Sequence, residues 1–378
     1  MRVEPTVPGQ ALAAIRAPIL AAGAESVDAP ILQPLGLLLD LAGEQMRARL
    51  FVVQSEGGAE SCLRPDFTVA IARQHLERGA AAGRYAYEGV AFRAAIGETT
   101  PEEFLQIGLE RFEVTQADIV GSDAETVALA WRCAVAGGRS DLTLWLGDVG
   151  LFAAFIDGMN LPEALAGRLK RAAGRPRLMQ AELARAGSDA APAPGGQLTG
   201  MLSQLAPAQA AELLEEVWSL AGIEPVGGRG PAEIAQRLVR RAQAAEAPSL
   251  TPAQADSIRR FLAVSEEPAS AFALARAAAE PAGASFRQAM EAWESRLRAL
   301  EALGVPTDRL RFATALGHAF DYYDGLTFEI RSEALGADRA LAVGGRYDGL
   351  MARLGDAGQT RAIGCMVRPW RAFAGGEA

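Results

Sequence analysis

The sequence predicts an α+β fold in which an antiparallel β-sheet is flanked by helices and interrupted by a helical insertion. Residues 45–150 and 305–370 contain short runs of β-branched, aromatic and glycine residues, which favour strands. Residues 160–300 consist mostly of Ala, Leu, Arg and Glu with few aromatic residues, which favours helices. We therefore predict three segments along the chain: a first core segment at 1–158, a helical insertion at 159–300 and a second core segment at 301–378.

The composition is that of a globular protein and argues against several other classes. Half of the 378 residues are hydrophobic and 22% are charged, which allows a substantial core. The net charge of -9 argues against a protein whose main task is binding nucleic acid. The 3 cysteines and 2 histidines share no metal-ligand spacing, so we expect neither a metal site nor a cofactor. Without a secretory signal or a long apolar stretch, we expect a cytoplasmic protein with no membrane partner.

Local patterns predict the elements of the first core segment. Apolar residues at helical spacing near the N-terminus predict a helix that Pro18 kinks or ends early. Residues 50–54, Leu-Phe-Val-Val-Gln, predict a buried strand. Asp66 is a candidate N-cap for a helix that ends near Gly79.

Two runs of alternating character, 85–93 and 103–114, predict an antiparallel hairpin with a loop of about nine residues. In the second run, Leu105, Ile107 and Leu109 share the apolar face that helices should cover. The opposite face presents Gln106 and Glu110 with Gly108 between them, and a glycine there leaves room for a ligand on the sheet. The same pattern also fits a half-exposed strand whose polar residues face water.

Eight short segments follow one another in a fixed order: P-I-L (30–32), L-R-P-D-F-T (63–68), F-R (92–93), E-F-L-Q-I-G-L-E (103–110), D-A-E (123–125), D-Y-Y-D-G-L-T-F-E (321–329), G-G-R-Y-D-G-L (344–350) and I-G-C-M-V-R-P-W-R (363–371). This order resembles that of the catalytic core of class II histidyl-tRNA synthetases. The resemblance covers roughly residues 8–155 and 305–372. It implies the fold of that family, an antiparallel sheet flanked by helices.

By this resemblance, seven residues would contact a bound histidine: Asp66, Thr68, Arg93, Gln106, Glu110, Tyr323 and Tyr347. Asp66, Gln106 and Glu110 can accept hydrogen bonds from the ammonium group of histidine. Arg93 can face the carboxylate, and the tyrosine hydroxyls can contact the imidazole nitrogens. Asp66 stands where the family usually has the longer Glu. The alternative interpretation is an Arg93–Asp66 salt bridge, an N-cap at Asp66, and tyrosines that merely pack on the sheet.

The sequence departs from the synthetase pattern where ATP would be held. His318 stands where the family has an arginine, and residues 94–101 lack the basic residue of the corresponding loop. Arg368 replaces a glycine of the last motif, in which Arg371 alone is retained. We therefore expect no catalytic residues in this chain. Because it ends shortly after Arg371, we also expect no anticodon-binding domain and no tRNA partner.

A class II core with an amino-acid site but degenerate ATP-binding positions resembles the regulatory subunits of ATP phosphoribosyltransferase. This resemblance implies a non-catalytic partner of the short-form catalytic subunit, required for its activity and for feedback inhibition by histidine in the first step of histidine biosynthesis. It also implies a homodimer, paired through the segment around Pro30, within a hetero-oligomer. The inhibitory histidine would bind in the inherited pocket or at a subunit interface. The alternatives are a truncated enzyme that forms histidyl-adenylate and a stand-alone histidine-binding module.

Overall fold

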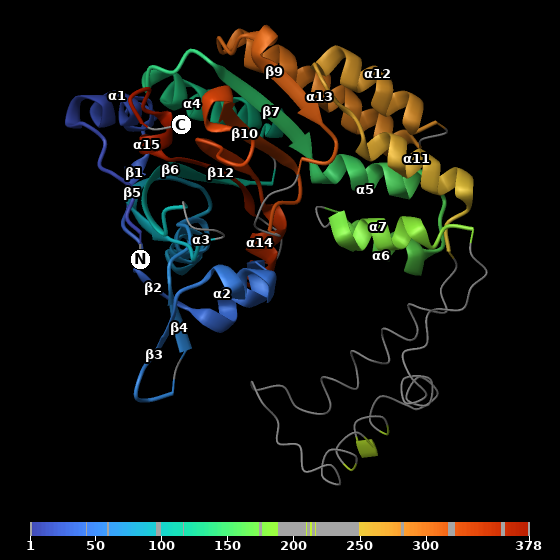
Figure 1. Ribbon diagram of the computed structural model, residues 1–378, viewed down its shortest axis with the longest axis horizontal. Helices are drawn as coiled ribbons and strands as arrows, with labels where there is room; N and C mark the ends of the chain where they lie inside the picture. Colours follow the sequence, from blue (N-terminus) through green and yellow to red (C-terminus); the bar gives the residue numbers. More distant parts are fainter. Residues whose placement is uncertain are drawn as a thin grey trace. The chain divides into compact units, whose positions relative to one another are not determined.

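The computed structural model describes residues 2–42, 44–58, 60–95, 100–115, 117–173, 176–187, 209, 212–213, 216, 249–280, 283–316, 322–356 and 360–376 (Figure 1). The chain divides into two compact units, Met1–Gly158 with Arg260–Ala378, and Met159–Arg259. Across the described ranges, no helix is long and apolar enough to span a membrane.

The first unit is built on a nine-stranded sheet with the order β1-β5-β6-β12-β11-β10-β7-β9-β8. All pairings from β5 to β7 are antiparallel, whereas β1 pairs with β5 and β9 pairs with β7 in parallel. The predicted antiparallel sheet is therefore confirmed. The strands are β1 (Glu25–Ser26), β5 (Gly83–Phe92), β6 (Glu103–Val114), β7 (Leu142–Asp148), β8 (Ser265–Glu266), β9 (Leu310–Ala313), β10 (Leu326–Ser332), β11 (Ala342–Arg346) and β12 (Thr360–Val367).

Helices lie against both faces of this sheet (Figure 1). On one face, α4 packs on β12, β11 and β10, and Arg111 of β6 forms an ion pair with Glu125 of α4. On the other face, α2, α3 and α14 share a buried core with Phe112 of β6. The helices of this unit are α1 (Gly9–Leu20), α2 (Leu35–Ala42), α3 (Thr68–Glu77), α4 (Ile119–Ala136), α5 (Val149–Gly158), α12 (Pro268–Ala278), α13 (Ala284–Ala302), α14 (Asp348–Arg353) and α15 (Pro369–Ala372), with 3₁₀ turns η1 (Glu44–Arg49), η2 (Thr307–Arg309) and η3 (Glu333–Leu335).

The predicted hairpin is present as β5 and β6, which pair in antiparallel register from Gly83–Phe112 to Phe92–Glu103. The face of β6 that carries Leu109 and Arg111 is the one turned toward α4, because Arg111 reaches Glu125 on that helix. The alternative of a half-exposed strand is wrong, since Gln106 and Glu110 on the opposite face are also buried.

The strand predicted at 50–54 exists only as β3 (Val52–Gln54), and the expectation that it is buried is wrong. It belongs to a separate three-stranded sheet with the order β2-β4-β3, where β2 is Leu32–Pro34 and β4 is Glu60–Leu63. Because β3 lies at an edge and pairs only with β4, all of its residues remain exposed. An apolar run indicates a strand but does not show what covers it.

Two predicted helix ends also differ from the structure. The helix α1 continues beyond Pro18 to Leu20, because a proline in the last turn costs only one backbone hydrogen bond. The N-cap of α3 is Phe67 rather than Asp66, and Phe67 makes no side-chain capping bond. The helix α3 ends at Glu77, and Gly79 follows it with a positive φ of 62°.

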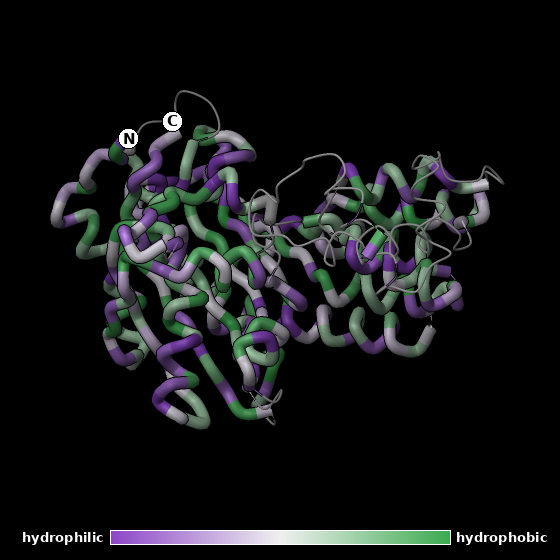
Figure 2. The backbone as a smooth tube through the Cα atoms, turned by 90° about the horizontal axis from the view of Figure 1, so that it is seen from below, coloured by the Kyte–Doolittle hydropathy of each residue, from purple (hydrophilic) through white to green (hydrophobic). Residues whose placement is uncertain are grey.

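The second unit contains α6 (Glu163–Ala172), α7 (Pro176–Ala184) and the first part of α11 (Pro252–Leu262). The predicted insertion reached residue 300, but in the structure residues 260–300 belong to the first unit. The reason is that α13 packs on α4 and α5, and its Trp293 indole donates a 2.8 Å hydrogen bond to Asp148 of β7. Its buried residues recur every three or four positions, as expected of an amphipathic helix. Hydrophilic and hydrophobic residues likewise alternate along the helices in Figure 2.

Candidate functional site

A cavity of about 160 Å³ lies on the face of the sheet formed by β6, β12 and β11. Aromatic and acidic side chains line one end of it, and three arginines line the other. No group of three or more His, Cys, Asp or Glu that could hold a metal occurs in the part of the chain the structure describes. The lining residues are Asp66, Thr68, Tyr87, Arg93, Glu110, Tyr322, Tyr323, Glu329, Asp338, Ala340, Val343, Tyr347, Gly364, Cys365, Met366, Arg368 and Arg371.

Glu110 is the central carboxylate of the acidic end and is only 1% exposed. The Thr68 hydroxyl donates a 2.7 Å hydrogen bond to its Oε1, and the Tyr347 hydroxyl donates to its Oε2. Gly364 faces Glu110 on the neighbouring strand, and a Cβ on this glycine would collide with the carboxylate. Burial raises the pKa of Glu110 to about 8, and the negative charge of Asp66 adds to this rise. Glu110 is therefore mostly protonated at about pH 7.

Asp66 forms the second acidic position, on the loop that enters α3. Its carboxylate accepts a 2.9 Å hydrogen bond from the Tyr322 hydroxyl. Burial raises the pKa of Asp66, although the positive charge of Arg93 and hydrogen bonds from the Tyr322 hydroxyl and the Thr68 backbone oppose the rise. Two buried carboxyl groups thus share one end of the cavity, together with the hydroxyls of several tyrosines.

The basic end combines Arg93 from the end of β5 with Arg368 and Arg371 around the start of α15. The Arg368 guanidinium lies 3.8 Å from the centroid of the Phe104 ring, and that of Arg93 lies 5.5 Å from the same centroid. Burial lowers the pKa of Arg368 to about 10 and that of Arg371 to about 9. Arg368 also forms a buried ion pair with Glu4. The cavity is therefore acidic at one end and basic at the other.

Six of the seven residues predicted to contact histidine line this cavity, and Gln106 does not. Gln106 is fully buried, and its amide nitrogen lies 3.7 Å from the sulfur of Met366, which itself lines the cavity. The space predicted above Gly108 is also taken, because a Cβ there would collide with the Tyr87 hydroxyl. Of the three degenerate positions, Arg368 and Arg371 line the cavity, and His318 lies outside the described residues.

Several residues of the site were missed from the sequence, and three of them illustrate why. Tyr87 lies directly opposite Gly108 in the hairpin register, so the register would have revealed it. Tyr322 stands beside Tyr323 in the quoted D-Y-Y segment, but only its neighbour was assigned. Glu4 had no local signal at all, because it reaches Arg368 across 364 positions of sequence.

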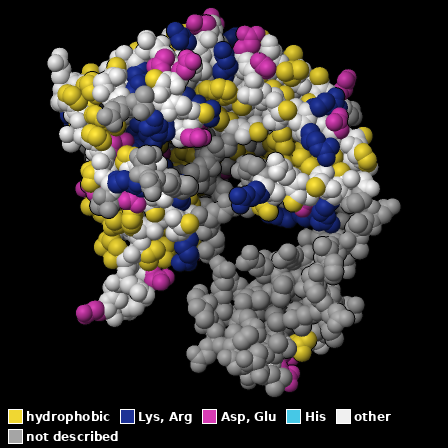
Figure 3. Space-filling model, in the orientation of Figure 1, with side chains coloured by type: hydrophobic (Ala, Val, Ile, Leu, Met, Phe, Trp, Pro, Cys, Tyr) yellow, Lys and Arg dark blue, Asp and Glu magenta, His cyan; other side chains and the backbone are white. Residues whose placement is uncertain are grey.

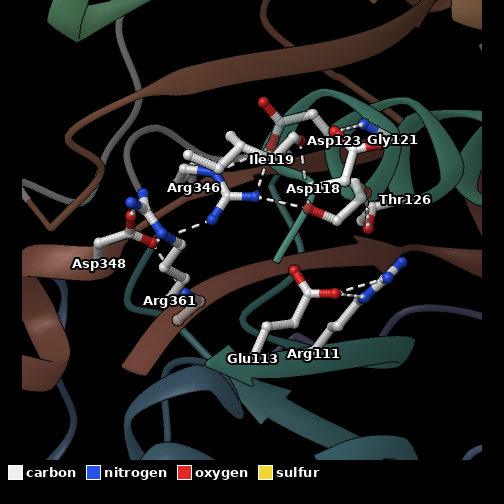
Figure 4. Close-up of polar contacts among 12 residues, drawn as sticks. Arg111, Glu113, Asp118, Ile119, Gly121, Asp123, Thr126, Arg346, Asp348 and Arg361 are labelled. Carbon is white, nitrogen blue, oxygen red and sulfur yellow. Dashed lines mark hydrogen bonds and ion pairs between the residues drawn. The ribbon is translucent and has the colours of Figure 1, made fainter. Parts of the chain in front are cut away.

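An ionic network, buried at Arg346 and Asp123, joins two of the quoted segments (Figure 4). Arg346 of β11 donates to Asp123 of α4 over 2.9 Å from Nε and to the Ser122 hydroxyl over 2.9 Å from Nη2. It also donates over 3.1 Å to Asp348, whose other carboxylate oxygen faces Arg361 at 3.4 Å. Because Tyr347 lies between Arg346 and Asp348, this network fixes the backbone that presents the Tyr347 hydroxyl to Glu110.

Solved structures show which class of fold the chain has. A structure described as an ATP phosphoribosyltransferase regulatory subunit/histidyl-tRNA synthetase from Bacillus halodurans C matches with a TM-score of 0.64 and 19% identity, covering 98% of this chain and 80% of that chain. A histidyl-tRNA synthetase from Nostoc sp. PCC 7120 matches with a TM-score of 0.59 and 15% identity, covering 98% and 74%. The chain therefore has the fold of the class II aminoacyl-tRNA synthetases.

Sequence comparison shows to which family with this fold the chain belongs. The family model of histidyl-tRNA synthetase matches residues 10–220 and 229–369. The ATP phosphoribosyltransferase regulatory subunit of Brucella anthropi is 34% identical over 348 residues, covering 91% of each chain. That of Mesorhizobium japonicum is 36% identical over 341 residues, covering 87% of each. The chain belongs to the family of ATP phosphoribosyltransferase regulatory subunits, which confirms the resemblance inferred from the eight segments.

Proposed function

We propose that this chain binds histidine in the cavity and, as a non-catalytic subunit, passes feedback inhibition to a short-form ATP phosphoribosyltransferase catalytic subunit that needs it for activity. Family membership supports the regulatory role and implies a catalytic partner. The observation that carries the choice of ligand is the opposed charge of the two cavity ends. A free amino acid is a zwitterion, and both of its charged groups need partners when they are buried.

The acidic end suits the ammonium group of the ligand. Glu110 and Asp66 are buried and have raised pKa values, so the positive charge of a bound ammonium would favour the ionised form of both. Thr68 holds Glu110 in place through its hydroxyl. The Tyr323 and Tyr347 side chains line the same end and offer hydroxyls to the two imidazole nitrogens.

The basic end suits the carboxylate of the ligand and disfavours a nucleotide. Arg93 lines the cavity and lies within electrostatic reach of both Asp66 and Arg371. Farther along, the side chain of Arg368 is buried and paired with Glu4, where the synthetase pattern has a glycine. A guanidinium and a carboxylate packed at this point reduce the space open to a triphosphate. This supports a role without adenylate formation.

The surface around Pro30 supports a homodimer within the hetero-oligomer. Ile31 and Leu32 follow Pro30 and are 49% and 52% exposed, and Val52 and Val53 of the same small sheet are 45% and 39% exposed. Hydrophobic side chains gather over this region of the surface (Figure 3). Exposed apolar groups on an edge strand favour pairing with a second copy of the chain.

Feedback inhibition then requires that histidine bind differently to two arrangements of the complex. A coupling free energy of about 1–3 kcal/mol would change the affinity of the catalytic subunit for its substrates about 5- to 150-fold. Because coupling is reciprocal, substrates of the catalytic subunit should change the affinity of the complex for histidine by the same factor.

A mixing assay tests the proposal. The catalytic subunit is assayed alone, with this chain, and with this chain plus histidine, and calorimetry measures histidine binding to this chain alone. We expect activity only in the mixture, inhibition by histidine, and loss of both binding and inhibition in Glu110→Gln. If Glu110→Gln loses binding but keeps inhibition, the inhibitory site lies at a subunit interface. Pyrophosphate exchange by this chain with histidine and ATP would instead support a truncated synthetase.

A further inference from the structure

The N-terminal strap, residues 2–4, runs alongside the start of β6. The backbone N–H of Glu4 donates a 2.8 Å hydrogen bond to the carbonyl of Glu103, and the carbonyl of Arg2 accepts from the N–H groups of Glu102 and Glu103 at 2.8 and 3.0 Å. Val3 forms an isolated parallel bridge with Glu103. In this extended conformation Val3 points outward and is 63% exposed, whereas Glu4 points inward and is 7% exposed.

The strap carries the Glu4 carboxylate to the arginines of the basic end. Glu4 Oε1 accepts from Arg368 Nη2, and both side chains are at least 95% buried. The positive charge of Arg371 also acts on Glu4, lowering a pKa that burial raises. Glu4 does not itself line the cavity. Two other acidic residues do: Glu329, which pairs with Arg331 at 2.7 Å, and Asp338, which is exposed.

The Glu4 carboxylate does not accept all the hydrogen bonds that the arginines of the basic end can donate. Arg368 Nε and Glu4 Oε2 are buried and have no hydrogen-bond partner among the described residues. Burial lowers the pKa of Arg371, and the positive charges of Arg368 and Arg93 lower it further, so the three guanidinium groups lie within electrostatic reach of one another. Three clustered guanidinium groups form the kind of array that binds phosphate, because each offers several donors in a fixed plane.

We infer that Glu4 is a specificity-determining residue: its carboxylate occupies an oxyanion site at the basic end of the cavity and keeps phosphate-bearing ligands out. Without Glu4, a bound ligand carboxylate would neutralise only one of the three positive charges of Arg93, Arg368 and Arg371. Two positive charges would remain uncompensated. A phosphate or pyrophosphate group would then be the matching ligand. With Glu4 in place, the remaining site accepts a ligand that carries a single carboxylate. The inference relies on the proposed function only in taking the cavity as the ligand site.

The test compares Glu4→Gln with the wild type and with Glu88→Gln, which removes the same charge from an exposed side chain. Inorganic phosphate and pyrophosphate are titrated by calorimetry and by thermal unfolding at constant ionic strength. We expect Glu4→Gln to bind pyrophosphate at least tenfold more tightly than the other two proteins. The added Arg371→Met change should remove this gain, which places the anion in the cavity. If Glu4→Gln does not fold, a chain lacking residues 1–4 is used in the same titrations.

Two results would overturn the inference: equal pyrophosphate affinity of the wild type and Glu4→Gln, or a gain in Glu88→Gln as large as in Glu4→Gln. Histidine is titrated separately against the wild type. Absence of histidine binding would reject the proposed function but would leave the comparison of pyrophosphate affinities unchanged. Histidine binding without any gain of pyrophosphate affinity would reject the role of Glu4 alone.

Discussion

The guanidinium of Arg346 lies 2.7 Å from the carboxylate of Asp123, and both side chains are almost completely buried. The second oxygen of Asp123 accepts a 2.7 Å hydrogen bond from Arg296 of α13. A single carboxylate therefore joins β11 to α4 and α13. Because Arg346 directly precedes Tyr347, the contact that fixes the helices on the sheet also fixes a tyrosine of the cavity.

Replacing Asp123 by Asn should destabilise the protein strongly. The change leaves the buried guanidinium groups of Arg346 and Arg296 without their shared counter-charge, which typically costs about 3–5 kcal/mol. Urea denaturation measures the loss. The control is Glu25→Gln, which breaks the solvent-exposed pair with Arg78 and should cost much less. Equal losses in the two variants would mean that the network contributes little.

Replacing Glu110 by Gln should weaken histidine binding at least thirtyfold, corresponding to about 2 kcal/mol or more. Gln keeps the shape and accepts from Thr68, but it offers no negative charge to the buried ammonium. Calorimetry with the isolated chain measures the affinity, and Glu88→Gln serves as the control with the same change in net charge. An unchanged affinity would show that histidine does not use this cavity.

The sequence allowed the hairpin and its two faces to be predicted, because strict alternation and a short connecting loop are local signals. It did not reveal what each face meets. Gln106 shares the face of Glu110, yet Met366, which lies 260 positions away in the chain, is its contact. Gly108 leaves room on the sheet, but Tyr87 of the partner strand fills it. Such contacts depend on register and tertiary packing, which local patterns do not encode.

The boundary of the insertion was missed for a similar reason. The helix α13 has the Ala, Leu, Arg and Glu composition of the preceding segment, so composition alone placed it in the insertion. In the structure its Trp293 and Arg296 reach Asp148 and Asp123 in the first unit. Composition indicates that a segment is helical, whereas a few buried polar contacts decide which unit it joins.

Histidine binding should release a proton from Glu110 at pH 7. In the empty cavity the pKa of Glu110 is about 8, so the carboxyl is mostly protonated, and it must ionise to pair with an ammonium. The apparent affinity should therefore rise about tenfold from pH 6 to pH 7 and level off above pH 8. Calorimetry in two buffers of different ionisation enthalpy counts the protons. The same series with Glu110→Gln isolates the titration of the ligand itself, and identical pH profiles for the two proteins would contradict the assignment.

The raised pKa of Glu110 also predicts how the stability of the ligand-free protein depends on pH. The carboxyl ionises near its ordinary pKa of 4.5 in the unfolded chain and only near 8 in the folded one. Its contribution to the free energy of unfolding is therefore fully present below about pH 4.5 and is lost as the pH rises through 8.

Glu110→Gln has no charge to bury, so its stability relative to the wild type should increase from pH 5 to pH 8. Urea denaturation of both proteins at the two pH values measures this difference, and saturating histidine should reduce it because the bound ammonium stabilises the ionised carboxylate of the wild type. Together with weakened histidine binding in Glu110→Gln, this result would show that a carboxylate needed for binding is kept at the expense of the stability of the empty fold. A difference that does not change with pH would show that Glu110 ionises as readily in the folded protein as in the unfolded one.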